Sequence, residues 1–322
     1  MFLKSIDYEK CTSCLACVHI CTNSRVIGTN EQGKPIYIHD NKCIGCGHCL
    51  AICPEQAITF APLARNDHAG ASYFADARPL DTDRALPDAA TVQDFLGSTR
   101  TSRFFTARPA ERDKLALILD SMVRAPSAGN EQNRNFYILT DPAKIAALEA
   151  QVKAHYQRSL QIFRNPLVAR LISLSSAWKA SQANKRHPTG LPADQTSVRA
   201  FYRFFLNMFR QELADDSANL SYLRGAPALM IISTNRKKSM HQAFYKGDAT
   251  IAAVYGTLMA RSLGLSACWL GLLEIAVNRD QTLRQALGLG DQERMDAGLA
   301  LGYSDLVWRQ MPPRGPVKVI WR

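Results

Sequence analysis

Two runs of cysteine with the same spacing stand near the start of the chain. Each run reads C-x₂-C-x₂-C-x₃-C, and together they contain Cys11, Cys14, Cys17, Cys21, Cys43, Cys46, Cys49 and Cys53. Thiolates are soft ligands, and this spacing lets three cysteines of a run bind one cubane cluster while the fourth reaches the other cluster. The sequence therefore predicts two [4Fe–4S] clusters and one-electron redox chemistry.

The exchange of the fourth cysteine defines two ligand sets. One is Cys11, Cys14, Cys17 and Cys53, and the other is Cys43, Cys46, Cys49 and Cys21. Zinc is the alternative metal. It takes four ligands, often as two CxxC pairs, so two interlocked runs of four fit clusters better. The small residues Gly45 and Gly47 leave room for backbone amides to approach the sulfurs.

Disulfide bonds would be another use of cysteine, and the start of the chain argues against them. Asp7 and Glu9 interrupt any apolar stretch in MFLKSIDYEKC, so no secretory signal is expected. No stretch approaches the roughly 18 consecutive apolar residues of a membrane span, and membrane contact is not expected. We therefore expect a cytoplasmic protein in a reducing compartment, where clustered thiols bind metal.

An internal repeat organises the first part of the chain. A shift of 32 residues superimposes the two cysteine runs and also places Ile6 on Ile38 and Lys10 on Lys42. Two copies of one small unit therefore fill residues 1–60, and this part resembles the bacterial two-[4Fe–4S] ferredoxins. Residues 61–92 are rich in Ala, Asp and Pro and lack apolar periodicity, so we expect a linker there.

Three later segments carry groups suited to a phosphate and a polar cofactor chain. They are TRTSRFF (99–105), APSAGNEQNRNFYIL (125–139) and GYSDLVWRQMPPRGPVKVIW (302–321). Guanidinium groups bind phosphate through several donors at once. In this order the segments resemble the nitroreductase-like FMN flavoproteins. The resemblance implies an α+β domain over 93–322 that forms a homodimer with two FMN sites at the subunit interface.

The same resemblance gives each polar residue a role. It assigns the FMN phosphate to Arg100, Thr101, Arg103 and Arg314; the phosphate, ribityl chain or ring edge to Ser127, Asn130 and Gln132; and a backbone amide at the flavin N5 edge to Leu272, with Gly271 beside it. Asn133 and Arg134 stand where the family prefers Pro-Trp. No side chain is expected to act as a catalytic group, and Cys268 is expected to be a core thiol.

Hydrophobic periodicity predicts the elements that position these residues. After Glu111, apolar residues recur at helical spacing as Leu115, Ile118, Leu119 and Met122. Further helices are expected over 142–158, 166–183, 197–213 and 248–263, and strands over 136–140, 228–234, 265–271 and 317–321. The predicted fold class is α+β: an N-terminal ferredoxin-like two-cluster module followed by an α+β nitroreductase-like FMN domain.

The net charge of +11 raises the question of a polyanionic partner. Residues 151–225, a helical segment, carry 11 basic and 4 acidic side chains and include the aromatic run FYRFFLNMFR (201–210). We interpret this basic segment as dimer-interface or core packing first, as a substrate cap second, and as a membrane-surface contact third, which the basic and aromatic mix permits but nothing requires. No nucleic-acid motif occurs, and each cluster and FMN would add about −2. Nucleic acid is therefore not an expected partner.

A fusion of clusters with FMN indicates an FMN-dependent oxidoreductase. Single electrons from an external donor such as ferredoxin or flavodoxin would pass through the clusters to FMN, which would reduce a nitroaromatic, quinone or activated alkene. The alternatives reverse the flow, with NAD(P)H or a substrate reducing FMN and the clusters serving a partner protein, or make the chain a redox sensor without turnover. NAD(P)H is also a possible reductant in the first case.

Overall fold

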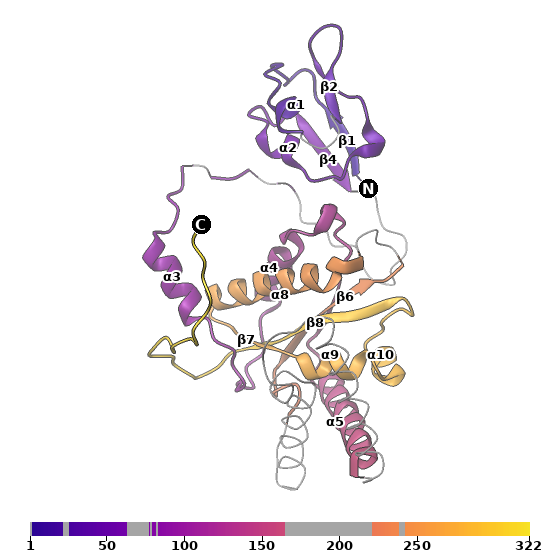
Figure 1. Ribbon diagram of the computed structural model, residues 1–322, viewed down its shortest axis with the longest axis vertical. Helices are drawn as coiled ribbons and strands as arrows, with labels where there is room; N and C mark the ends of the chain where they lie inside the picture. The colour runs from indigo at the N-terminus through magenta and orange to yellow at the C-terminus, as the bar shows by residue number, and fades with distance from the viewer. Residues whose placement is uncertain are drawn as a thin grey trace.

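A computed structural model describes residues 2–21, 26–62, 77, 79–81, 83–164, 221–237 and 242–322 (Figure 1). The helices predicted over 166–183 and 197–213, and with them most of the basic segment, lie outside these residues. Within the described part of the chain, no helix is both long and apolar enough to cross a membrane.

The N-terminal module is built from two small antiparallel sheets and two short helices. Strand β1 (Phe2–Ile6) pairs with β4 (Ile58–Pro62), and β2 (Ile27–Thr29) pairs with β3 (Pro35–Tyr37). Helix α1 (Ala16–Ile20) and helix α2 (His48–Ile52) each contain the third cysteine of a run. A 3₁₀ turn, η1 (Asp40–Lys42), precedes the second run.

Helices α1 and α2 are related by the same 32-residue shift as the two cysteine runs. Adding 32 to the bounds of α1 gives the bounds of α2. Both helices start after a residue in the left-handed conformation, Leu15 with φ of 60° and Gly47 with φ of 75°. This turn sends the chain sharply from the cysteine loop into the helix, so that Cys17 and Cys49 enter the same small core as Val26 and Ile58.

The larger domain is a four-stranded antiparallel sheet between two helical layers. The strand order is β5 (Asn135–Leu139), β6 (Ala228–Asn235), β8 (Glu293–Gly302) and β7 (Ser266–Trp269). Strands β6 and β8 are buried along nearly their whole length, because they lie in the middle of the sheet and are covered on both faces. The strand predictions over 136–140 and 228–234 are confirmed.

Helices α4 (Arg112–Arg124) and α8 (Tyr245–Ser262) cover one face of this sheet. Helices α5 (Pro142–Arg164), α9 (Gly271–Val277) and α10 (Gln281–Ala286) cover the other face (Figure 1). The periodicity that predicts α4 is confirmed, since Leu115, Ile118 and Met122 are its buried residues. Gly256 of α8 lets the two helices approach closely, because a Cβ there would lie 2.8 Å from the Met122 side chain.

Two of the predicted strands differ from the structure: one is shorter than expected and the other does not form. The strand expected over 265–271 stops at Trp269, and Gly271 already begins α9. The strand expected over 317–321 is wrong: no helix or strand follows β8 in the described tail, 303–322. A strand needs a neighbour for its backbone hydrogen bonds, and the tail leaves Val317 80% and Trp321 94% exposed.

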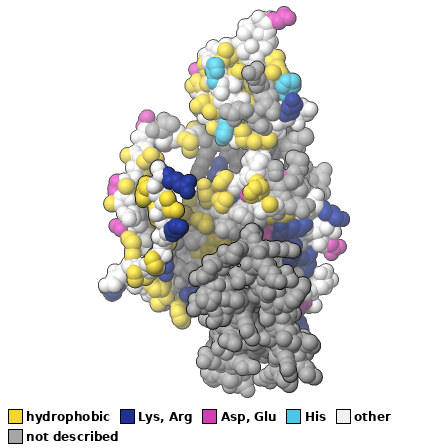
Figure 2. Space-filling model, viewed as in Figure 1, with side chains coloured by type: hydrophobic (Ala, Val, Ile, Leu, Met, Phe, Trp, Pro, Cys, Tyr) yellow, Lys and Arg dark blue, Asp and Glu magenta, His cyan; other side chains and the backbone are white. Residues whose placement is uncertain are grey.

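The tail instead lies along α3 (Ala89–Ser98). The Met311 side chain packs where a Cβ on Gly97 would stand. Figure 2 shows hydrophobic side chains together with Lys and Arg on this side of the molecule. The remaining short elements are η2 (Ala128–Asn130), which follows α4, and η3 (Gln242–Phe244), which precedes α8.

Candidate iron–sulfur and flavin sites

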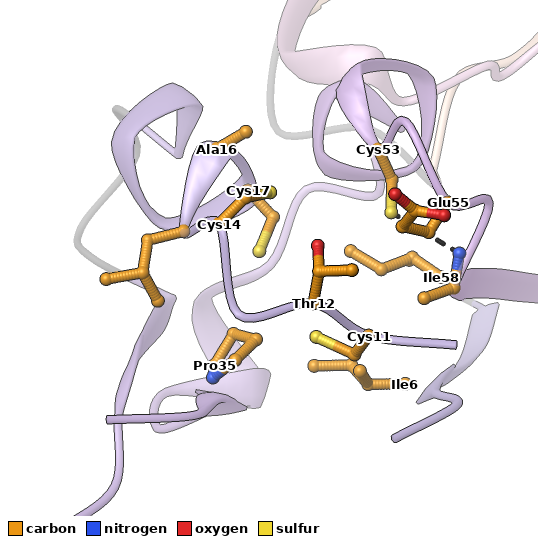
Figure 3. Close-up of a pocket in the computed structure, with 12 residues that line it drawn as sticks. Ile6, Cys11, Thr12, Cys14, Ala16, Cys17, Pro35, Cys53, Glu55 and Ile58 are labelled. Atoms are coloured by element: carbon orange, nitrogen blue, oxygen red, sulfur yellow. Dashed lines mark hydrogen bonds between the residues drawn. The ribbon is translucent and has the colours of Figure 1, made fainter. Parts of the chain in front are cut away.

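Four cysteines from two distant parts of the module line one cavity. They are Cys11, Cys14 and Cys17, from the loop before α1 and its first turn, and Cys53, which follows α2 (Figure 3). The remaining lining includes the apolar residues Ile6, Pro35 and Ile58. This set is the first of the two ligand sets expected from the cysteine spacing, and its members converge although 42 positions separate Cys11 from Cys53.

Four thiols around a partly apolar cavity are the kind of donor set that a [4Fe–4S] cluster uses. A zinc site needs all four ligands within about 2.3 Å of one ion, whereas the thiolates of a cubane cluster each bind a different iron. Thiols that surround a shared cavity therefore match the donor set of a [4Fe–4S] cluster.

The second set combines three cysteines at or before α2 with Cys21, which follows α1. Cys49 is buried in the module core, and Cys21 and Cys43 pack against that core. Cys46 is exposed. The backbone amide of Gly45 donates a hydrogen bond to Cys43 Sγ at 3.4 Å. In the first set, the amide of Ala57 likewise donates one to Cys53 Sγ at 3.3 Å. Amide donors of this kind stabilise thiolates and tune cluster potentials.

Burial acts against the thiolate form of two of these cysteines. It raises the pKa of the Cys17 and Cys49 thiols above their ordinary value, chiefly by desolvation. The Tyr37 hydroxyl lies 3.9 Å from Cys49 Sγ, and burial raises the pKa of this hydroxyl as well. A cation bound to the sulfurs offsets such a desolvation cost, because metal ligation requires the deprotonated thiol.

The first phosphate-binding candidate segment runs beside strand β7. Thr101 forms a parallel bridge with Ala267, and the Arg103 side chain is exposed. Ser102 is 1% exposed: its amide donates to the Ala267 carbonyl at 3.0 Å, and its hydroxyl lies 3.2 Å from that of Ser304. Ser102 was not among the sequence candidates, yet it fixes the loop that carries Arg100 and Arg103.

The backbone amides proposed for the flavin edge lie at the start of α9. The Leu270 amide donates to the Gly298 carbonyl at 2.9 Å, and Glu274 is the first residue of α9 whose amide bonds back, to the Leu270 carbonyl. The amides of Gly271 and Leu272 therefore have no acceptor within the helix. The Tyr156 hydroxyl donates to the Leu272 carbonyl at 2.7 Å and holds this turn in place.

The loop with Ser127, Asn130 and Gln132 is tightly folded after α4. The Gln132 amide donates to Ser127 Oγ at 3.0 Å, and the Gln132 side-chain amide donates to Asn130 Oδ1 at 3.1 Å. Asn130 and Gln132 both have positive φ, at 54° and 49°. The Ala128 amide donates to the Asp248 carboxylate at 3.2 Å, which joins the loop to the first turns of α8.

The two residues that replace the family's Pro-Trp have structural partners. Asn133 exchanges hydrogen bonds with the backbone of Asn235 at the end of β6. Arg134 is 7% exposed and donates to the carbonyls of Val123, Ala125 and Pro126, which end α4. Burial lowers the pKa of the Arg134 guanidinium, and the Asp248 carboxylate partly counters this. Arg134 thus holds the 127–132 loop to the end of α4.

The three flavin segments do not meet at one point in a single chain. The segment with Arg100 lies near the C-terminal end of α8. There, Arg261 Nη2 is 3.5 Å from the hydroxyl of Ser98, two residues before Arg100. Asp248, which binds the 127–132 loop, is 13 residues earlier on α8, a rise of about 20 Å. Arg314 is exposed on the tail. The phosphate candidates and the second loop therefore lie toward opposite ends of α8.

Comparison with known families now places both parts of the chain. The model of the nitroreductase family matches residues 96–303, and the model of the 4Fe-4S dicluster domain matches residues 3–54. The chain belongs to the nitroreductase family. Ahead of its nitroreductase domain it carries a 4Fe–4S dicluster ferredoxin domain, so it combines iron–sulfur electron transfer with the FMN-dependent oxidoreductase fold.

Individual relatives resemble one part or the other. An archaeal-type glutamate synthase [NADPH] of Thermotoga maritima is 39% identical over 82 residues, which are 24% of this chain and 13% of that protein. The chain thus matches only about an eighth of that relative's length. A nitroreductase with bound FMN from Bacteroides fragilis shares 18% identity at a TM-score of 0.49, covering 71% of this chain and 98% of the other.

Another similar structure is the FMN- and NADPH-dependent nitroreductase NfnB from sphigopyxis sp. strain HMH. It is 24% identical at a TM-score of 0.43 and covers 69% of this chain and 94% of its own.

The position of Arg134 in the nitroreductase domain leads to a stability prediction. Replacing Arg134 with Met keeps much of its volume but leaves three carbonyl groups without their donor, so we expect the domain to lose about 2–3 kcal/mol of stability. Thermal unfolding of the anaerobic holoprotein measures this. Arg134→Lys, which keeps the charge but not the planar fork, should fall between Met and the original residue. Equal melting of all three proteins would contradict this role.

Proposed function

We propose that this protein is an iron–sulfur flavoprotein oxidoreductase that carries single electrons through two [4Fe–4S] clusters to FMN. The acceptor is a small organic molecule such as a nitroaromatic, a quinone or an activated alkene. The observation that carries the proposal is a direct contact between the two domains: the Asn130 side chain of the nitroreductase domain donates to the Gly45 carbonyl, within a cysteine run, at 2.8 Å.

The proposed domains are the module at 1–60, the linker at 61–92 and the FMN domain at 93–322. In the module, the ligand sets are the two defined by the exchanged fourth cysteine. In the FMN domain, Arg100, Thr101, Arg103 and Arg314 neutralise the phosphate. Ser127 and Gln132 bind the polar chain and ring edge, and the amides of Leu272 and Gly271 donate to the ring. Asn130 belongs to the same loop, but its side-chain amide is engaged by the Ile44 and Gly45 carbonyls of the module.

FMN supplies the exchange between one-electron and two-electron chemistry. In the proposed reaction two low-potential donors would each give one electron, and the acceptor would gain the two electrons together with two protons. The role of the chain is placement. Ser102 holds the two arginines, Arg134 supports the second loop, and neither is required to exchange a proton with the substrate.

The geometry of the proposed flavin segments supports a homodimer. The phosphate candidates and the second loop lie toward opposite ends of α8 within one chain, so we infer that one copy supplies the phosphate side of each site and the second copy supplies the loop. The exposed apolar tail, with Val317, Ile320 and Trp321, has the character of a segment that is covered in such an assembly.

Phosphate binding is tested by comparing FMN with riboflavin. Arg103→Ala should weaken FMN binding by about 10- to 100-fold, because a charge-assisted bond to phosphate is lost. Riboflavin, which lacks the phosphate, should bind both proteins alike. Arg108→Ala is the matched control, since Arg108 pairs with Glu111 and stacks on Tyr303. A parallel loss for FMN and riboflavin would assign Arg103 to general structure instead.

Electron flow is tested by mixing the anaerobic holoprotein with reduced ferredoxin and following the flavin band. Cys46→Ser should lower the iron content from about eight to about four per chain and suppress flavin reduction by ferredoxin. In Cys268→Ser, reduced ferredoxin should reduce the flavin as it does in the parent protein, because Cys268 is a buried thiol outside both ligand sets. Full turnover by Cys46→Ser with NADH or NADPH would show that electrons bypass the clusters. A flavin that reduces no acceptor would support a sensor.

Shared flavin sites are tested with mixed dimers. Arg100→Ala/Arg103→Ala and Ser127→Ala/Gln132→Ala chains should each bind little FMN alone. Co-expressed, they form dimers in which one of the two sites has both halves intact, so about one FMN per mixed dimer is expected. No recovery of binding in purified mixed dimers would mean that each chain holds its own flavin.

A further inference from the structure

The contact between the two domains selects one of the two cysteine sets. We propose that Asn130 docks the Cys43–Cys46 loop onto the flavin-binding loop, so that the cluster held by Cys43, Cys46, Cys49 and Cys21 is the one next to FMN. The cluster of Cys11, Cys14, Cys17 and Cys53 is then the entry point for the external donor. This inference rests on the proposed function, in which electrons pass from module to flavin.

A continuous series of hydrogen bonds joins the cysteine loop to the flavin loop. The Gly45 amide donates to Cys43 Sγ at 3.4 Å. The Asn130 side-chain amide donates to the carbonyls of Gly45 at 2.8 Å and Ile44 at 3.1 Å. The Gln132 side-chain amide then donates to Asn130 Oδ1 at 3.1 Å. Three successive donors thus connect a cluster-ligand sulfur with a candidate flavin residue.

Asn130 is suited to this position by both its backbone and its side chain. Its φ of 54° lies in the left-handed region, which asparagine tolerates better than most residues. Its amide group offers donors on one side and an acceptor on the other. The donors face the module, and the acceptor is held by Gln132, whose own backbone is fixed to Ser127 Oγ at 3.0 Å. The side chain is therefore held in its docking orientation.

The repeat provides an internal comparison. In the first cysteine run, Thr12 and Ser13 occupy the places of Ile44 and Gly45. Thr12 lines the cavity of the first set, together with Ile6, Pro35 and Ile58 of the module itself. In Figure 1 the segment after α4 lies beside the module, and α2 is closer to the nitroreductase domain than α1. Because electron transfer slows steeply with distance, the nearer cluster is the natural last carrier.

Two variants separate docking from charge. Asn130→Gly keeps the left-handed backbone but removes the donor, and Asn130→Asp keeps the acceptor for Gln132 while placing a carboxylate against two carbonyls. Gln285→Ala, an exposed amide on α10, is the control. Hydrogen exchange on the full-length holoprotein should show amides 43–47 opening about tenfold faster in both variants, with 11–17 unchanged. Unchanged exchange at 43–47 in both variants would overturn the docking role.

An EPR redox titration identifies the cluster involved. Cys14→Ser and Cys46→Ser, equivalent positions in the repeat, assign the two cluster signals. Asn130→Asp should lower the midpoint potential of the signal that Cys46→Ser alters, because the added negative charge stands beside its ligand loop. A shift confined to the Cys14 signal, or equal shifts in both, would overturn the proposed order.

Rapid mixing with reduced ferredoxin completes the test, at saturating FMN with flavin content measured. Both Asn130 variants should reduce their clusters at the parent rate but reduce the flavin about tenfold more slowly. Slowed cluster reduction with normal cluster-to-flavin transfer would overturn the order. If the parent protein reduces both clusters and never its flavin, the proposed function itself fails, which is a different result.

Discussion

The first 62 residues depend on thiols that burial by itself would keep protonated. Desolvation raises the pKa of Cys17 and Cys49 at the centre of the module. In the described part of this module they are surrounded by two two-stranded sheets, two five-residue helices and one 3₁₀ turn, which is little structure for independent stability. Iron ligation would meet both needs, because a metal binds the deprotonated thiol and each ligand set joins segments that are far apart in the sequence.

In the nitroreductase domain, the segments proposed to bind FMN are loops and a helix start that are carried by a buried frame. Strands β6 and β8 supply that frame. Glu293, the first residue of β8, is buried and accepts hydrogen bonds from Tyr137 and Asn135 of β5 and from Ser233 of β6. The loops start where these strands and helices end. Ser102 joins the end of β8 to β7, and Arg134 closes α4. A precise cofactor site on loops requires such buried supports.

Local patterns predicted much of this architecture. Cysteine spacing predicted the dicluster domain, and helical periodicity predicted α4, because both signals are complete within a short window. The roles of Ser102 and Arg134 escaped prediction, since their partners lie far along the chain or are backbone carbonyls that carry no sequence signal. The tail from 317 to 321 has strand-forming residues, but strand formation also needs a partner edge, which sequence periodicity does not supply.

The sequence alone determined which chemical groups this protein carries: eight thiols at cluster spacing, and arginine, serine and amide groups in an order that resembles the flavin family. Only the tertiary structure decided which groups meet. It brought Cys53 to the cavity of Cys11, placed the phosphate candidates and the 127–132 loop toward opposite ends of α8, and joined Asn130 to Gly45 across 85 positions. Residue type fixes what a side chain can bind, whereas the packing of distant segments fixes where its partner stands.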